Sequence, residues 1–312
     1  MQKRLIPILL ASYSAGSLAS GYLSLNYGSY TPALDSAVRY SELEEISNAR
    51  YQSIDGRYDF GALPVPALEF SYQQSDSYSD TSLSGHGDAN IDSVDDFSAL
   101  LLYLGSGEHQ RPRITLASED FTALYRVNQS DRITNAQGEV LQRNDYFTLN
   151  RSSKKIGLTW GQDQRLNLMH PDKDWMLTLS YIETELDYVL FSEPEIVSGF
   201  DKQGTIKNDT FAALGLDFNF HYYSALGQSN WFATVGPDIS VTLGEISGLK
   251  GGYFSAVGYK AQAVPFSGML TLQGSVLDVS QARIKTEVDE TVDRLEHSGL
   301  SYEVFVKLRY DF

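Results

Sequence analysis

Five histidines are the residues of this chain best suited to acid–base chemistry, and one of them has a serine and an acid nearby in sequence. His221 follows Asp217 by four residues and precedes Ser224 by three. A nucleophilic serine needs an imidazole within hydrogen-bond distance, and that imidazole needs a carboxylate to orient it. In an extended strand, residues three apart point to opposite faces, so Ser224 would face away from His221. We therefore predict no catalytic residues and no enzymatic activity.

A second candidate for chemistry is an acidic segment that resembles part of a calcium-binding loop at Asp88, Asn90 and Asp92. The complete loop pattern requires glycine at its sixth position and glutamate at its twelfth. This chain has Ser93 and Ala99 at those positions. We therefore expect an acidic loop in solvent, and we predict neither a metal site nor a cofactor.

The elements that would position such residues are strands, and the end of the chain shows this most clearly. Between 300 and 312 every even-numbered residue is apolar or aromatic, whereas the odd-numbered residues are polar except for Phe305. Successive side chains of a strand point to opposite faces, so one face is apolar and the other is charged. Turning the charged face toward lipid would cost about 2–4 kcal/mol for a basic residue near the bilayer centre. The pattern is typical of a transmembrane barrel strand. Its apolar face supplies the predicted assembly signal: Val304, Val306, Leu308, Tyr310 and Phe312.

The same alternation identifies side chains that would face the interior of a barrel. They carry both signs of charge, which fits either a charged pore lining or a closed interior held together by ion pairs. The predicted pore lining comprises Arg57, Asp59, Glu69, Asp217, Asp238, Lys260, Glu303, Lys307 and Arg309, and Asp55 and His221 share this orientation. Twelve strands about 4.7 Å apart and tilted by about 40° would leave at most about 10–13 Å between inward side chains.

Alternation along the rest of the chain brings the predicted number of strands to twelve, an even number as in bacterial barrels. The expected ranges are 21–30, 50–60, 64–74, 96–104, 113–127, 145–161, 175–188, 206–225, 230–243, 252–264, 267–280 and 300–312. The segments between them alternate between short turns and long polar loops, as periplasmic turns and extracellular loops do. The long loops are expected at 31–49, 75–95, 128–144, 189–205 and 281–299.

Three local features predict a helix, a bulge and aromatic residues at the membrane interfaces. A capping-box pattern, Ser41-Glu-Leu-Glu44, can start a helix that either plugs the lumen or lies outside it. Pro237 is expected at a bulge, because proline cannot donate to a strand ladder. Aromatic residues are expected at the two membrane interfaces. Trp160, Trp175 and Trp231 would lie at one rim, and Tyr27, Tyr188 and Tyr253 near the other.

The start of the chain has the organisation of a secretory signal peptide. A short basic region and an apolar stretch precede small residues, so cleavage is expected after Ala19. This divides the chain into a signal peptide, 1–19, and one barrel domain, 20–312. The absence of cysteine excludes disulfides, thiolate metal sites and a cysteine nucleophile. The net charge of −16 argues against binding to nucleic acid.

The terminal Tyr310 and Phe312 pattern, the signal peptide and the strand number together resemble Gram-negative outer-membrane β-barrels, and in particular the solitary barrels related to autotransporter translocator domains. This resemblance implies an all-β fold, a transmembrane antiparallel up-and-down barrel in the outer membrane. It also implies contact with outer-membrane lipids and lipopolysaccharide, and insertion by the barrel assembly machinery. It supplies no catalytic residues, and the sequence leaves the oligomeric state open.

Two functions are compatible with these observations. One is a narrow porin-like channel for small solutes or ions. The other is a closed scaffold whose acidic extracellular loops bind surface partners or cations. A third class, an outer-membrane hydrolase, is disfavoured because the chain lacks the compact histidine–serine motif of the twelve-stranded phospholipases.

Overall fold

The computed structural model describes residues 20–31, 49–60, 67–83, 87–104, 112–127, 131–162, 173–192, 202–227, 230–261, 264–285, 292–298 and 301–312. Within these ranges the regular secondary structure consists of strands, and no helix is long and apolar enough to cross a membrane. The strands are β1 (Ser20–Thr31), β2 (Ala49–Asp59), β3 (Ala67–Leu83), β4 (Gly87–Tyr103), β5 (Arg113–Arg126), β6 (Asp131–Thr134), β7 (Tyr146–Gln162), β8 (Lys173–Ser192), β9 (Lys202–Ala225), β10 (Trp231–Gly244), β11 (Ile246–Lys260), β12 (Phe266–Lys285), β13 (Val292–Ser298) and β14 (Ser301–Asp311).

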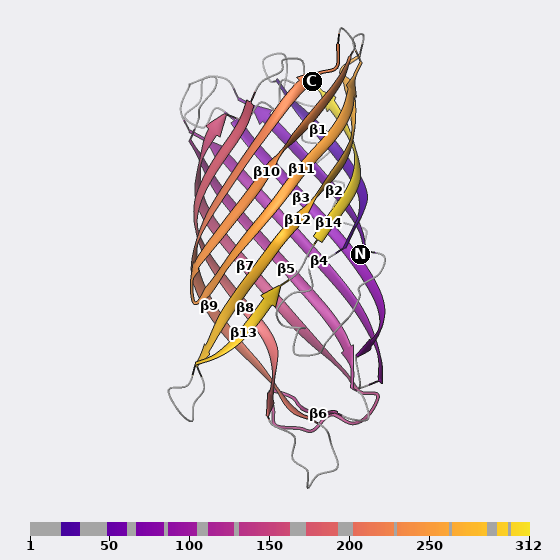
Figure 1. Ribbon diagram of the computed structural model, residues 1–312, viewed down its shortest axis with the longest axis vertical. Helices are drawn as coiled ribbons and strands as arrows, with labels where there is room; N and C mark the ends of the chain where they lie inside the picture. Colours follow the sequence, from indigo (N-terminus) through magenta and orange to yellow (C-terminus); the bar gives the residue numbers. More distant parts are fainter. Residues whose placement is uncertain are drawn as a thin grey trace.

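Twelve of these strands form a closed antiparallel barrel in which each strand pairs with the next barrel strand along the chain (Figure 1). The barrel closes where β14 pairs with β1. At the end of this seam the backbone groups of Gly21 and Phe312 exchange two hydrogen bonds of 3.0 Å each. The predicted twelve-stranded up-and-down barrel is therefore confirmed, and closure gives each of the twelve barrel strands a neighbour on both sides.

The two ends of the barrel differ in their connections. We call the end at which β1 begins and β14 ends the terminal rim, and the opposite end the loop rim. The remaining strands, β6 and β13, lie toward the loop rim (Figure 1). There β6 pairs in parallel with the start of β9, and β13 pairs antiparallel with the end of β12. Both lie in segments expected to be irregular loops, so those loops are partly ordered as strands.

The expected long loop at 75–95 is wrong, because β3 and β4 continue through it as a paired hairpin. The pairing runs without a register shift from Leu68 opposite Leu102 to Leu83 opposite Gly87. The acidic segment with Asp88 is therefore extended strand rather than a calcium-type loop. The polar sequence of this segment does not indicate a strand, because a strand beyond the lipid can meet water on both faces and needs no apolar alternation. The predicted helix at 41–49 lies outside the described residues, apart from Ala49, which begins β2.

The expected bulge at Pro237 is also wrong. The β9–β10 pairing skips Gly236 and Pro237, but it resumes in the same register with Asp238 opposite Asn219. Proline lacks the amide hydrogen, so hydrogen bonds are lost there without the insertion of a residue. A register shift does occur in the β11–β12 pairing, between Gly251 and Gly252.

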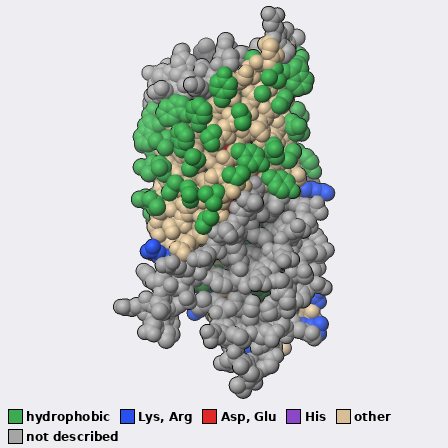
Figure 2. Space-filling model, in the orientation of Figure 1, with side chains coloured by type: hydrophobic (Ala, Val, Ile, Leu, Met, Phe, Trp, Pro, Cys, Tyr) green, Lys and Arg blue, Asp and Glu red, His purple; other side chains and the backbone are tan. Residues whose placement is uncertain are grey.

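The outer surface of the barrel carries an apolar band. Figure 2 shows hydrophobic side chains gathered over the part of the visible face that is nearer to the terminal rim. On β9 and β14 the outward side chains include the exposed Leu214, Leu216 and Leu308. On β7 the outward face changes from the exposed Ile156 to the exposed Lys154. Such a change marks the depth at which a strand leaves the hydrocarbon region.

The expected aromatic rims agree only in part with the structure. The rings of Trp160 and Trp231 are exposed near the terminal rim, and Tyr27 is exposed on β1. Tyr188, however, is 1% exposed, and its hydroxyl donates a 2.5 Å hydrogen bond to Asp209. Tyr188 points inward because the outward positions of this part of β8 are occupied by residues such as Glu185, so its assignment to the interface is wrong.

Candidate functional site: the barrel lumen

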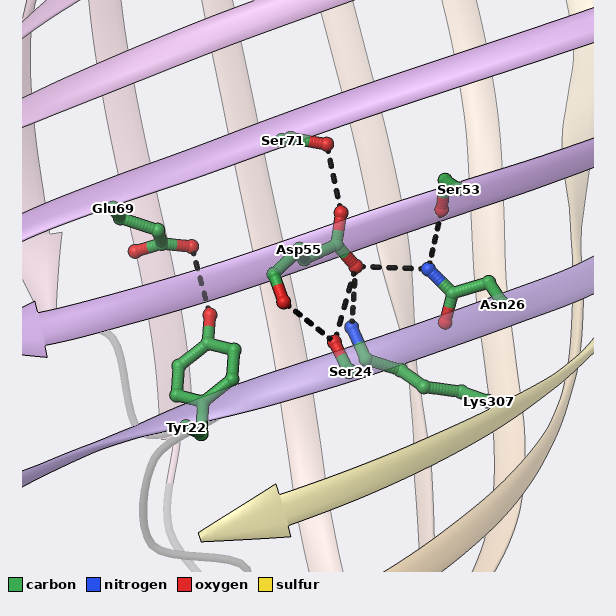
Figure 3. Close-up of polar contacts among 8 residues, drawn as sticks. All are labelled: Tyr22, Ser24, Asn26, Ser53, Asp55, Glu69, Ser71 and Lys307. Atoms are coloured by element: carbon green, nitrogen blue, oxygen red, sulfur yellow. Dashed lines mark hydrogen bonds and ion pairs between the residues drawn. The ribbon is translucent and has the colours of Figure 1, made fainter. Parts of the chain in front are cut away.

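Asp55 on β2 is the centre of a hydrogen-bonded network on the inner wall (Figure 3). Its Oδ2 atom accepts hydrogen bonds from Asn26 Nδ2 at 2.8 Å, from Lys307 Nζ at 3.1 Å and from Ser24 Oγ at 3.3 Å. Its Oδ1 atom accepts a fourth hydrogen bond, from Ser71 Oγ at 2.7 Å. The donors come from β1, β3 and β14. Because a largely buried carboxylate is costly without such partners, this network holds Asp55 and Lys307 against the wall.

Glu69 on β3 connects two tyrosines closer to the terminal rim. Its carboxylate accepts hydrogen bonds from Tyr22 Oη at 3.0 Å, also drawn in Figure 3, and from Tyr103 Oη at 2.7 Å. Each tyrosine ring lies against an arginine. Arg57 lies 4.3 Å from the centre of the Tyr103 ring, and Arg309 lies 4.1 Å from the centre of the Tyr22 ring. These contacts combine hydrogen bonding with cation–π attraction.

The arginines of this region also have acidic or carbonyl partners. Arg57 pairs with Asp59 at 2.8 Å, and Arg309 pairs with Asp311 at 2.5 Å. Arg113, which is 1% exposed, donates to the carbonyl oxygen of Gly161 at 3.3 Å and lies 4.9 Å from the Tyr103 ring centre. The interior beside the terminal rim is thus lined by buried arginines that are held by neighbouring groups.

A second polar network lies deeper in the barrel, on β7, β9 and β10. Asp217 forms an ion pair with Lys155, and it accepts a hydrogen bond from Ser240 Oγ at 2.6 Å. Lys155 lies on β7 and Asp217 on β9, so the ion pair spans the intervening β8. Asp217 was predicted to face the interior. Lys155 was not among the predicted lining residues, although its inward position follows from the same alternation along β7.

His221 is buried beside this network, and its partner is not the acid nearest in sequence. Its Nε2 atom lies 2.8 Å from Asp238 Oδ1, and its ring stacks on Phe254 with 4.7 Å between ring centres. Ser224 instead donates to the carbonyl oxygen of Ala225 at 3.4 Å. The structure therefore does not bring serine, histidine and acid together at this position. In the described ranges no group of three or more histidine or acidic residues is arranged to hold a metal ion.

Two cavities that are lined by described residues lie in the lumen between these networks. The first has a volume of about 320 Å³ and is lined from β1 to β4 on one side and from β9 to β14 on the other. The second, of about 400 Å³, is lined from β7 to β12 and by β14. Gln273 and Glu303 line both cavities, and Gln273 Nε2 donates to Glu303 Oε2 at 2.6 Å. Side chains from nearly the whole circumference therefore face this interior space.

An apolar cluster lies toward the loop rim, and the sequence analysis missed it. Its buried members come from β5 to β9, from β12 and from an adjoining segment: Tyr125, Val127, Ile133, Leu149, Leu186, Tyr188, Val189, Phe211 and Ala282. The available signal was the inward face of β8, which changes from the polar Ser180 and Thr184 to the apolar Leu186 and Tyr188. This change was not interpreted as a buried cluster, because the whole interior was expected to be polar.

The predicted lining residues are distributed over three places. Glu69, Glu303, Lys307 and Arg309 line the first cavity, and Asp217, Asp238 and Glu303 line the second. Arg57 and Asp59 form their ion pair beside the terminal rim. Lys260 lies at the end of β11 and lines neither of these two cavities.

The predicted assembly residues lie on the outer face of β14, and all are exposed: Val304, Val306, Leu308, Tyr310 and Phe312. Their strand pairs with both β12 and β1, so it completes the barrel. Recognition of these side chains by the assembly machinery stays a prediction.

Comparison with known proteins bears on the fold. No protein-family model and no curated protein sequence matches the chain. Among solved structures, the translocator domain of the autotransporter NalP from Neisseria meningitidis matches over 98% of this chain and 92% of that one, with 8% identity and a TM-score of 0.51. The β-domain of the Bordetella autotransporter BrkA matches over 94% of this chain and all of that one, with 10% identity and a TM-score of 0.44. A Pseudomonas aeruginosa FadL homologue matches over 94% of this chain and 90% of that one, with 10% identity and a TM-score of 0.36. The match to the NalP translocator domain shows that the chain shares the β-barrel fold of that domain.

Proposed function

We propose that the protein is an integral outer-membrane barrel of a Gram-negative bacterium and forms a narrow, porin-like channel for small hydrophilic solutes or ions. The proposed location is supported by the apolar outer band, the closed barrel and the fold shared with the NalP translocator domain. Closed barrels are one of the two structures that satisfy every backbone hydrogen bond within a membrane.

The observation that carries the channel proposal is the direction of the interior contacts. The Lys307–Asp55 and Lys155–Asp217 ion pairs each span one intervening strand, whereas His221–Asp238 joins adjacent strands. These contacts run along the wall instead of across the lumen. A closed interior held by ion pairs would need contacts between opposite walls. The wall contacts described above leave the central space to the two cavities, which suits the passage of small solutes.

A specific observation favours the second candidate, a closed scaffold. The apolar cluster packs inside the barrel toward the loop rim, and Arg57, Arg113 and Arg309 occupy the interior beside the terminal rim. If both entrances stay closed, the polar networks would only stabilise the wall, and function would reside in the loops.

Single-channel recording in planar bilayers tests the proposal. We expect steady conductance from the intact protein, with a small unit current because the lumen is narrow. A variant that lacks residues 32–48 tests the plug suggested by the sequence, since a plug would make the variant conduct more. Absence of current from both proteins, with insertion verified by protease protection, would favour the closed scaffold.

A further inference from the structure

The carboxyl groups that line the first cavity differ in the groups that bind them. Asp55 has the ammonium group of Lys307 at 3.1 Å, whereas Glu69 is held by two tyrosine hydroxyls. Glu303 accepts a hydrogen bond from the neutral amide of Gln273, and within the described residues it forms no ion pair. Among the described residues, Glu303 therefore places in the lumen a carboxyl group that no cation pairs with at contact distance.

The cations around this cavity are already engaged. Lys307 is bound to Asp55, and Arg309 is bound to Asp311 and lies over the Tyr22 ring. Lys250 lines the second cavity and acts on Glu303 electrostatically, without an ion pair at contact distance among the described residues. Both cations among the described lining residues of the first cavity, Lys307 and Arg309, are thus paired, so the carboxyl group of Glu303 should favour an added cation over an anion.

The rest of the cavity wall is aromatic. Tyr51 and Phe305 pack edge to face with ring centres 5.5 Å apart, and Phe254 is held against His221. Phe232 and Tyr223 also line the cavity. Aromatic faces bind ammonium groups by cation–π attraction and apolar groups by contact, and they do not compensate anions.

We propose that the first cavity binds a small organic cation, with its ammonium group at Glu303 and its apolar body against the wall formed by Tyr51, Phe254 and Phe305. The inference rests on the proposed function, since it names a substrate class for the same lumen. The cavity volume of about 320 Å³ lies at the lower end of the range for small-molecule sites. A hydrated metal ion fits less well, because the described residues offer no group of three acidic or histidine ligands.

Equilibrium binding separates this site from the channel. The protein, purified in detergent, would be titrated calorimetrically with 2-phenylethylammonium, with neutral 2-phenylethanol and with anionic 3-phenylpropanoate. We expect the ammonium compound to bind at least about tenfold more tightly than the other two, since it alone adds a positive charge and cation–π attraction to the shared phenyl ring. Equal binding of the three compounds would overturn the proposal.

Variants locate the site. Glu303→Gln keeps the size of the side chain and removes its charge, so it should lower the affinity for 2-phenylethylammonium by about tenfold or more. Glu185→Gln, on the exposed outer face of β8, is the matched control and should leave binding unchanged. Phe254→Leu provides a second test from the aromatic wall and should also weaken binding. Unchanged affinity in both lumen variants would place the ligand elsewhere and refute the site.

The experiments can reject the channel and the cation site independently of each other. Binding that depends on Glu303, in a protein without conductance, would keep the cation site and reject the channel. Conductance without this binding would keep the channel and reject the site. If both hold, 2-phenylethylammonium should reduce the potassium current through the intact protein more than through Glu303→Gln.

Discussion

Lys307 on β14 donates a 3.1 Å hydrogen bond to Asp55 on β2, although the two residues are 252 positions apart in sequence. The side chain of Lys307 reaches across β1, so the contact bridges the strands at which the barrel closes. Both side chains are mostly buried, with 25% and 16% of their surface exposed. This ion pair therefore ties the last strand of the chain to the second one.

Removing this lysine should destabilise the barrel. Lys307→Met leaves Asp55 without its cation, and we expect the free energy of unfolding to fall by about 2 kcal/mol, since hydrogen bonds to charged groups contribute about that much. Urea unfolding in lipid vesicles, followed by tryptophan fluorescence, measures the effect. Lys154→Met, on the outer face of β7, is the control. A loss no larger than that of the control would contradict a stabilising role for the pair.

The charge of the second cavity should set ion selectivity if the barrel conducts. Lys250 lines this cavity, so Lys250→Glu replaces a positive charge there with a negative one and should make the channel more cation-selective. The reversal potential across a salt gradient reports the change. Lys154→Glu makes the same charge change outside the lumen and should have little effect. A similar shift from both variants would argue that surface charge, not the lumen, determines selectivity.

The apolar outer band predicts the cost of placing a charge there. Leu272 lies on the outer face of β12, about midway between Phe266 at the terminal rim and Val279. Leu272→Arg should destabilise the inserted barrel by about 2–4 kcal/mol, as expected near the bilayer midplane. Thr210→Arg, on the exposed face of β9 beyond the band, should cost about 0–1 kcal/mol. Unfolding from vesicles compares the two, and equal costs would mean that the band is misplaced.

The apolar cluster near the loop rim should behave like the core of a soluble protein. Leu186 is 2% exposed, so Leu186→Ala should cost about 2–5 kcal/mol through lost contacts and an unfilled cavity. Leu179 lies seven residues earlier, on the opposite, outer face of β8, and is 52% exposed. Leu179→Ala should cost clearly less, because lipid replaces the lost contacts. Chemical unfolding of both variants tests whether the loop rim is packed independently of lipid.

The strands that cross the lipid were predictable because the two solvents impose a period of two. On β9 the alternation of Leu214, Leu216 and Phe218 with Gly215 and Asp217 assigned both the strand and the orientation of its side chains. Beyond the apolar band this signal disappears, because both faces of a strand can meet water. For this reason the sequence around Asp88 resembles a loop although it forms a hairpin, and the sequence gives no signal for β6 and β13.

Interior contacts were predictable only as orientations. Alternation placed His221, Asp217 and Asp238 on inward faces, but it could not choose between the two acids as the partner of His221. The register of β9 against β10 decides this, since Asn219 faces Asp238 and thereby brings Asp238 beside His221. Distances between strands depend on how each strand slides against its neighbour, and one chain's residue pattern does not report that displacement.

The sequence by itself therefore determined the fold class, the number of barrel strands and the inward or outward face of residues such as Glu303 and Leu308, because each follows from local alternation between lipid and water. The tertiary structure alone decided that Lys307 meets Asp55, that Glu303 accepts a hydrogen bond from the amide of Gln273, and that an apolar cluster packs toward the loop rim. These are consequences of barrel closure and strand register, which bring together side chains that are far apart along the chain.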